Sequence, residues 1–99
     1  MKSGRTRVLA TLRAVSGREA DLRSVLEDLI EPTRGEVGCL HYELWQNQSD
    51  PAEFTFVEEW VSQEALAAHG ETEHIRRGRE RMGELLAEPM DLRLYERVR

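Results

Sequence analysis

Four stretches of the chain are rich in β-branched, aromatic or alternating apolar residues, which predicts four β-strands. We expect these strands at residues 7–15, 39–45, 54–61 and 90–98. A cluster of turn-forming residues, Asn47 to Pro51, separates the second stretch from the third. It is too short to hold a helix, so these two strands are expected to form a hairpin.

The segments between the other strands have helical periodicity. In the first segment, apolar residues recur at spacings of three and four and form one stripe: Leu22, Val25, Leu26, Leu29 and Ile30. Ser16 and Glu19 form a capping-box pattern that predicts the start of this helix. Pro32 is expected to limit or bend it, because proline cannot donate a backbone hydrogen bond.

The second segment predicts a pair of helices. Ser62 is expected to cap a short helix that Gly70 interrupts, and Thr72 to cap a further helix that Pro89 ends. The element order is then βαββαβ, which predicts an α+β, ferredoxin-like fold with a four-stranded antiparallel sheet and helices on one face. With 99 residues, we expect one domain over residues 1–99, its core at about 7–98.

The third strand is apolar on both of its faces. Phe54, Phe56 and Trp60 share one face with Glu58, whereas Val57 lies on the other. Two helices cover only one face of such a sheet, and an exposed patch of aromatic residues usually marks an interface or a ligand site. We therefore expect a homodimer in which the second face closes against a symmetry mate, around either a dry core or a ligand cavity.

Composition excludes several classes of function. Nineteen acidic against fourteen basic residues give a net charge of −5, which argues against a nucleic-acid or anionic-membrane binder. No apolar run approaches the roughly 20 residues of a membrane span. A single cysteine, Cys39, fits a reducing compartment, so a cytoplasmic location is expected.

Several stretches together resemble one family. They are the turn from Ser16 to Glu19, the strand from Gly38 to Leu44, Asp50-Pro51 in the hairpin, Glu58-Glu59-Trp60, and the helical segment from Ala65 to His74. In this order and spacing they are similar to the antibiotic biosynthesis monooxygenase domain. That domain belongs to the dimeric α/β barrel superfamily, which includes quinol monooxygenases of the YgiN type.

The resemblance implies a ferredoxin-like protomer, a homodimer whose sheets form a barrel, and a cavity between helices and sheet. It also implies oxidation of quinols or aromatic polyketides by O2 with no metal, flavin or other cofactor. The superfamily contains isomerases, heme-degrading enzymes and members without known activity as well. The fold is therefore inferred from this resemblance more safely than the reaction is.

Two histidines are candidate catalytic bases. His69 and His74 match the two helix histidines of the family, and imidazole can take a phenolic proton near neutral pH. His69 is the first choice because it follows the third strand more closely. The break at Gly70 leaves their mutual geometry open, and a capping or hydrogen-bonding role is the alternative for each.

Trp60 is the third candidate catalytic residue, as a flat apolar wall with one N–H donor, although a plain core role is equally compatible with its position. The expected substrate-binding residues are Trp60, Phe56, Glu58, Tyr42 and Phe54. For Glu58 the alternative is an ion pair with an arginine of the facing subunit. The arginines after His74 are expected on a solvated face, with one of them as an alternative at the cavity mouth.

No metal site is expected, because His41, His69 and His74 match no recognised ligand spacing. The leading hypothesis is a cofactor-independent monooxygenase acting on a quinol or phenolic aromatic compound. The alternatives are a dimer that binds a small aromatic metabolite without turnover, and an isomerase on the same scaffold.

Overall fold

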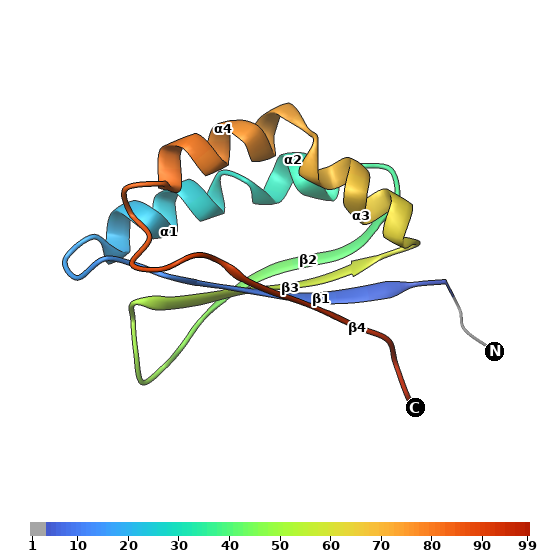
Figure 1. Cartoon of the computed structure of the whole chain (residues 1–99), viewed down its shortest axis with the longest axis horizontal. Helices are drawn as coiled ribbons and strands as arrows, with labels where there is room; N and C mark the ends of the chain where they lie inside the picture. Colours follow the sequence, from blue (N-terminus) through green and yellow to red (C-terminus); the bar gives the residue numbers. More distant parts are fainter. Residues whose placement is uncertain (1–3) are drawn as a thin grey trace.

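The computed structural model describes residues 4–99 as four strands and four helices (Figure 1). In chain order they are β1 (Thr6–Arg13), α1 (Glu19–Glu27), α2 (Ile30–Arg34), β2 (Cys39–Gln46), β3 (Glu53–Trp60), α3 (Gln63–Gly70), α4 (Glu73–Met82) and β4 (Asp91–Tyr95). All strand pairs are antiparallel, in the spatial order β2-β3-β1-β4. The predicted α+β, ferredoxin-like fold is confirmed, with each helical connection divided into two helices.

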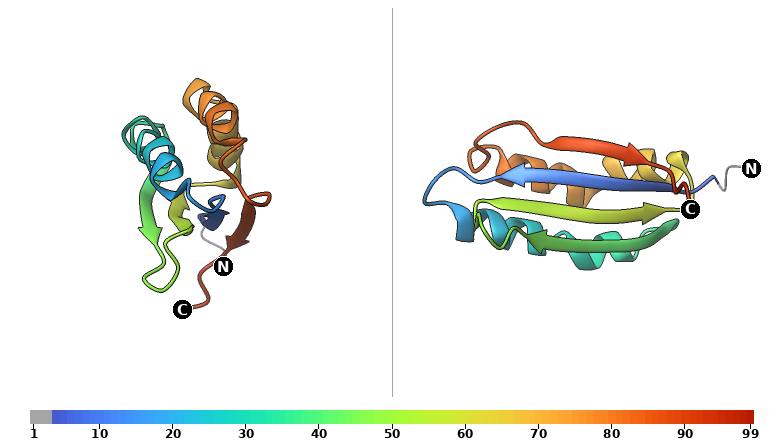
Figure 2. Two further views of the ribbon diagram at one scale, coloured as in Figure 1. Left: turned by 90° about the vertical axis from the view of Figure 1, so that its left-hand side faces the viewer. Right: turned by 90° about the horizontal axis from the view of Figure 1, so that it is seen from below.

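The helices form one layer and the sheet the other (Figure 2). Seen along the strands, α1 and α2 lie on the side of β2, whereas α4 lies on the side of β4. Within the described residues, no helix is long and apolar enough to cross a membrane. The cavity described below is lined by residues of these helices and of the sheet.

The first helix begins and ends differently from the prediction. The capping box is wrong, because α1 starts at Glu19 after Arg18, with no side-chain cap, and Ser16 lies in the preceding turn. This turn is closed by the Arg18 N–H, which donates to the carbonyl of Val15 at 2.9 Å. Pro32 falls in the first turn of α2, where its missing N–H costs little, and the helix breaks before it at residues 28–29.

The second helical segment follows the prediction at its start. The Ser62 hydroxyl accepts a hydrogen bond from the Ala65 N–H at 3.1 Å, which confirms the cap of α3. Thr72 occupies the N-cap position of α4, but its hydroxyl donates to the carbonyl of His69 at 2.8 Å instead of capping the helix. This bond fixes the short turn that joins α3 to α4.

Two strands depart from their predicted pattern. A register shift between Cys39 and His41 places Leu40 in an irregular position, so Leu40 is half-exposed and does not share the buried face of Tyr42. The last strand is shorter than predicted and ends at Tyr95. β4 forms an edge of the sheet, so its leucines remain partly exposed even on the face that the helices cover.

The face that carries the aromatic residues is the one that the chain's own helices cover. Phe54, Phe56, Glu58 and Trp60 are all buried, with Trp60 at 0% exposure. The expectation that a symmetry mate closes over these aromatics is therefore wrong. The uncovered face of the sheet carries Leu9, Thr11, Trp45, Thr55, Val57, Tyr95 and several charged residues.

Candidate functional site

A close approach between the loop after α2 and helix α3 places a carboxylate at the centre of the molecule. Gly38 adopts φ of +92°, and a Cβ at this position would lie 2.7 Å from the Cβ of Ala65. Only glycine fits this conformation and this contact. The carbonyl of Gly38 accepts a hydrogen bond from the Val61 N–H at 2.9 Å, which holds the loop beside the start of α3. Glu36, two residues before Gly38, is thereby directed under the helices.

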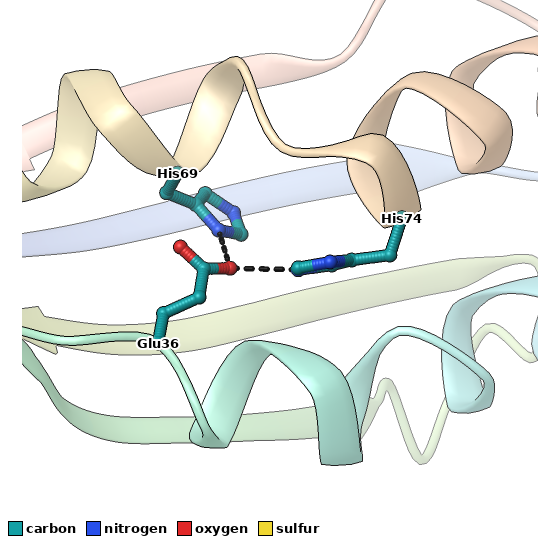
Figure 3. A group of neighbouring side chains, drawn as sticks. All are labelled: Glu36, His69 and His74. Carbon is teal, nitrogen blue, oxygen red and sulfur yellow. Dashed lines mark hydrogen bonds and ion pairs between the residues drawn. The ribbon is translucent and has the colours of Figure 1, made fainter.

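Glu36 joins the two histidines that the sequence left unconnected (Figure 3). Its Oε2 lies 2.7 Å from Nδ1 of His69, in the last turn of α3, and 2.7 Å from Nε2 of His74, in the first turn of α4. The side chains of Glu36 and His69 are about 10% exposed, and that of His74 is 23% exposed. The break between α3 and α4 is what allows both rings to reach one oxygen.

The carboxylate determines the tautomers of both rings. An ionised carboxylate only accepts hydrogen bonds, so each ring nitrogen that faces it carries the hydrogen. His69 then keeps its lone pair on Nε2, which has no hydrogen-bond partner among the described residues. Burial lowers the pKa of His69 below its usual value, which keeps the ring neutral at physiological pH. An oriented neutral imidazole with a free nitrogen is the form that a general base requires.

A cavity of about 440 Å³ separates the helices from the sheet, and His69 forms part of its wall. Most of the lining is apolar and comes from all four strands, from α3 and α4, and from the loops that adjoin the helices. It includes Ala10, Leu12, Leu29, Tyr42, Phe56, Leu66, Ile75, Met82, Leu86, Met90 and Leu92. Met90 and Leu92 are half-exposed, which places the mouth of the cavity at the β4 edge. The volume and the apolar wall suit a small aromatic molecule.

Glu58 is the carboxyl group on the cavity wall. It is 4% exposed, and burial raises its pKa from 4.5 to about 7. The indole Nε1 of Trp60 donates to its Oε1 at 2.9 Å. The Trp60 ring also packs against the ring of His69, with centroids 4.7 Å apart. Trp60 therefore positions both the carboxyl group and the imidazole, but it is not itself part of the cavity wall.

The remaining predicted residues divide between the cavity and its surroundings. Tyr42 and Phe56 line the cavity and stack with ring centroids 4.7 Å apart. Burial raises the pKa of Tyr42, so its phenol stays protonated. His74 lies behind Glu36, outside the cavity wall, and Phe54 is buried near the far end of β3, away from the cavity.

Sequence reasoning missed Glu36 altogether. Glu36 lies in a glycine-containing loop with no hydrophobic periodicity. The signal that could have found it is its position just before the family-like strand that begins at Gly38. Among the arginines after His74, Arg79 lines the cavity and donates to the carbonyl of Gly70 at 3.1 Å. Other arginines of α4 pair with acidic groups instead, Arg77 with Glu73 for example.

His41 does not join the other two histidines. It lies on the uncovered face of the sheet, where its Nε2 is 3.1 Å from Glu43. The three histidines therefore do not come together, and the cluster consists of Glu36, His69 and His74. Within the described residues, this is the group whose potential metal-binding atoms converge, all within 4.8 Å of one another.

Comparison with known proteins agrees with this geometry. The family model for antibiotic biosynthesis monooxygenase matches residues 6–81, which include the first three strands, the loop of Glu36 and both histidines. The chain belongs to the antibiotic biosynthesis monooxygenase family. A relative from Mycobacterium tuberculosis, named "Putative monooxygenase Rv0793", is 38% identical over 69 residues, covering 70% of this chain and 67% of that protein.

Solved structures of the family superimpose over the whole chain. The crystal structure of PA3566 from Pseudomonas aeruginosa has a TM-score of 0.93 at 31% identity and covers 100% of this chain and 99% of that one. An uncharacterised protein from Synechocystis is 26% identical over 90% of this chain, but the match spans only 60% of that relative. The fold of the matched crystal structure is thus present from end to end of this chain.

Proposed function

We propose that this chain is a cofactor-independent monooxygenase that oxidises a quinol or another phenolic aromatic compound with O2. The observation that carries the proposal is the setting of His69: its Nδ1 is held by Glu36, its Nε2 has no hydrogen-bond partner among the described residues, and the residue lines an apolar cavity. Membership of the monooxygenase family supports the reaction class.

The proposed reaction converts a phenolic ring and O2 into a quinone and water. His69 takes the phenolic proton, and Glu36 stabilises the resulting imidazolium. The electron-rich ring passes one electron to O2, and the radical pair recombines to form a C–O bond to a ring carbon that carries hydrogen. The O–O bond then breaks while that carbon loses its proton. One oxygen atom stays on the ring as a carbonyl, and the other leaves as water.

Two further groups suit this sequence of steps. Glu58 is protonated over much of the neutral range because its pKa is about 7, so it can donate a proton to the departing oxygen. The apolar wall that contains Phe56 and Tyr42 orients the ring and excludes water, which protects the radical pair. The proposed base, His69, is neutral, the proposed acid, Glu58, can hold a proton, and both residues line the same cavity.

The test is O2 uptake by protein treated with a chelator, with a panel of quinols and anthrones, in wild type, His69→Gln and His41→Gln. We expect uptake by wild type and by His41→Gln, and its loss in His69→Gln. Uptake that is unchanged in His69→Gln would contradict the assignment of the base. Absence of uptake above the spontaneous rate with every compound would contradict the monooxygenase itself.

An isomerase is the second candidate, because a neutral imidazole and a protonated carboxyl group on one cavity also suit proton transfer between two carbons of a substrate. It would change its substrate without consuming O2. Following each compound by chromatography during the O2 measurement separates the two reactions, and ligand binding without any change would instead indicate a binding protein.

We also infer that two copies pair through the uncovered face of the sheet. Leu9, Trp45 and Tyr95 are between 39% and 59% exposed on this face, an unusual number of large apolar groups for a solvated surface. Sedimentation equilibrium should give a dimer for wild type and for Val98→Glu, which alters an exposed residue beyond β4. It should give a monomer for the double variant Leu9→Glu, Trp45→Glu, and a dimer there would contradict the inference.

A further inference from the structure

The cluster of Glu36, His69 and His74 combines two imidazoles and one carboxylate, a ligand set typical of transition-metal sites. The three residues come from three separate segments: the loop after α2, the end of α3 and the start of α4 (Figure 3). Each segment is fixed by its own contacts, among them the Gly38 approach to Ala65 and the Thr72 bond to the His69 carbonyl. The ligands are therefore held together before any ion binds.

The distances are compatible with a small cation. Tetrahedral zinc with bonds of about 2.0–2.1 Å separates its ligand atoms by about 3.3 Å. In the structure, Nδ1 of His69 and Nε2 of His74 each lie 2.7 Å from Oε2 of Glu36, and all the potential ligand atoms fall within 4.8 Å. To hold an ion, each ring nitrogen would move about 0.6 Å away from the carboxylate oxygen, from 2.7 Å to about 3.3 Å.

The charge of the cluster also favours a cation. Glu36 is nearly buried, and its ion-pair partners among the described residues are the two histidines. Both rings are neutral when they bind metal, so the carboxylate would be the charged ligand. A divalent cation would balance this shielded negative charge.

We propose that Glu36, His69 and His74 bind one divalent first-row transition cation, with Zn²⁺ as the test ion, and that its binding inactivates His69 as a base. The second part follows from the tautomers. A metal at Nδ1 takes the lone pair there, so the ring hydrogen must move to Nε2. Nε2 then donates instead of accepting, and it can no longer take a proton from a substrate. The proposal that a cation binds rests on the geometry of the cluster alone, whereas the proposal that it inactivates His69 also rests on the proposed function.

Titration calorimetry of the untagged, chelator-treated chain with Zn²⁺ tests the binding. We expect one ion per chain in wild type, with affinity reduced by about 100-fold or more in His74→Gln and in Glu36→Gln. His41→Gln is the matched control, because it removes a histidine that is paired with a glutamate on the other face of the sheet. It should bind as wild type does.

Co²⁺ gives an independent spectroscopic reading. Bound by two imidazoles and a carboxylate, it should show intense visible bands in wild type and in His41→Gln but not in His74→Gln. Lack of binding to wild type, equal binding to His74→Gln, or loss of binding in His41→Gln would overturn the site. Circular dichroism of each variant checks that it is folded.

Zinc added to the O2-uptake assay tests the consequence. Uptake should fall as the site fills and return when a chelator is added. If zinc binds but O2 uptake is never seen, the metal site stands and the proposed function fails. If uptake is seen but zinc does not bind, the proposed function stands and the metal site fails. Uptake that increases with zinc would overturn the inactivation of His69.

Discussion

The two faces of the sheet carry similar chemical groups in different surroundings. Glu58 and Glu59 are neighbours in β3, yet Glu58 is buried beside the Trp60 indole, whereas Glu59 lies 3.3 Å from the guanidinium groups of Arg5 and Arg7 on the uncovered face. Burial raises the pKa of Glu58 to about 7. A glutamate side chain is thus a potential proton donor on the covered face, as Glu58, and an ordinary ion-pair partner on the uncovered face, as Glu59.

The histidines repeat this contrast. His69 and Glu36 are nearly buried, with a free imidazole nitrogen at a cavity, whereas the side chains of His41 and Glu43 are more than a third exposed. The hydrogen bond from His41 lowers the pKa of Glu43, as expected for a carboxylate in a polar setting. Both pairs place a nitrogen near a carboxylate oxygen. An imidazole beside a carboxylate therefore does not make a site by itself, because the pair must also be removed from water.

The largest expected effect separates the two histidine pairs. His69→Gln should reduce the rate of quinol-dependent O2 uptake by about 10²–10⁴-fold, the usual contribution of a general base. His41→Gln should leave the rate unchanged. Oxygen-electrode measurements under saturating substrate compare the two, and similar losses in both variants would remove the distinction between the faces.

Glu58 should make stability depend on pH. Because its pKa is raised in the folded state, the folded chain holds a proton that the unfolded chain releases above about pH 4.5. The stabilisation is complete below that pH and is lost as the pH rises to about 7, by roughly 3 kcal/mol in total. Urea unfolding at pH 5, 6, 7 and 8 should show this decline in wild type and not in Glu58→Gln. Parallel curves would contradict the shifted pKa.

Glu36 should matter more for stability than Glu43. In Glu36→Gln the neutral amide oxygen accepts the two imidazole hydrogen bonds more weakly than the carboxylate oxygen does, so we expect a loss of about 1–3 kcal/mol in the free energy of unfolding. Glu43→Gln alters an exposed pair and should not change this free energy measurably. Chemical denaturation at neutral pH measures both variants, and equal losses would contradict the comparison.

Glu59→Gln should have a small effect on stability. Its partners Arg5 and Arg7 lie on the uncovered face with side chains 54% and 32% exposed, so the loss should stay below about 1 kcal/mol and shrink further at high salt. Unfolding at low and high ionic strength provides the measurement. A large loss in the free energy of unfolding that does not depend on salt would mean that the uncovered face is as shielded from solvent as the cavity is.

Local patterns predicted much of this molecule correctly. The strands, the hairpin, the Ser62 cap and the grouping of Glu58 with Trp60 on one face all followed from periodicity and cap chemistry. The capping box at Ser16 failed because the chain satisfies the same backbone groups with a turn. The choice of covered face also failed, since alternation separates two faces but does not say which of them the helices cover.

The candidate site was predicted only in part. His69, named from the resemblance, and Phe56, Glu58 and Tyr42, named from their strands, line the cavity, but Phe54 does not. Trp60 was expected to contact substrate and instead supports Glu58 and His69 from behind. Whether these residues act in catalysis stays a prediction until the activity measurements are made.

The sequence by itself determined the order of elements, the family and the residues that share each strand face, because these depend on side-chain chemistry at short range. Only the tertiary structure decided that Glu36 meets His69 and His74. Their separations of 33 and 38 residues are bridged by a positive-φ glycine packed against Ala65 and by the break between α3 and α4. Contacts over such distances depend on how whole elements pack, and no local pattern of the chain encodes them.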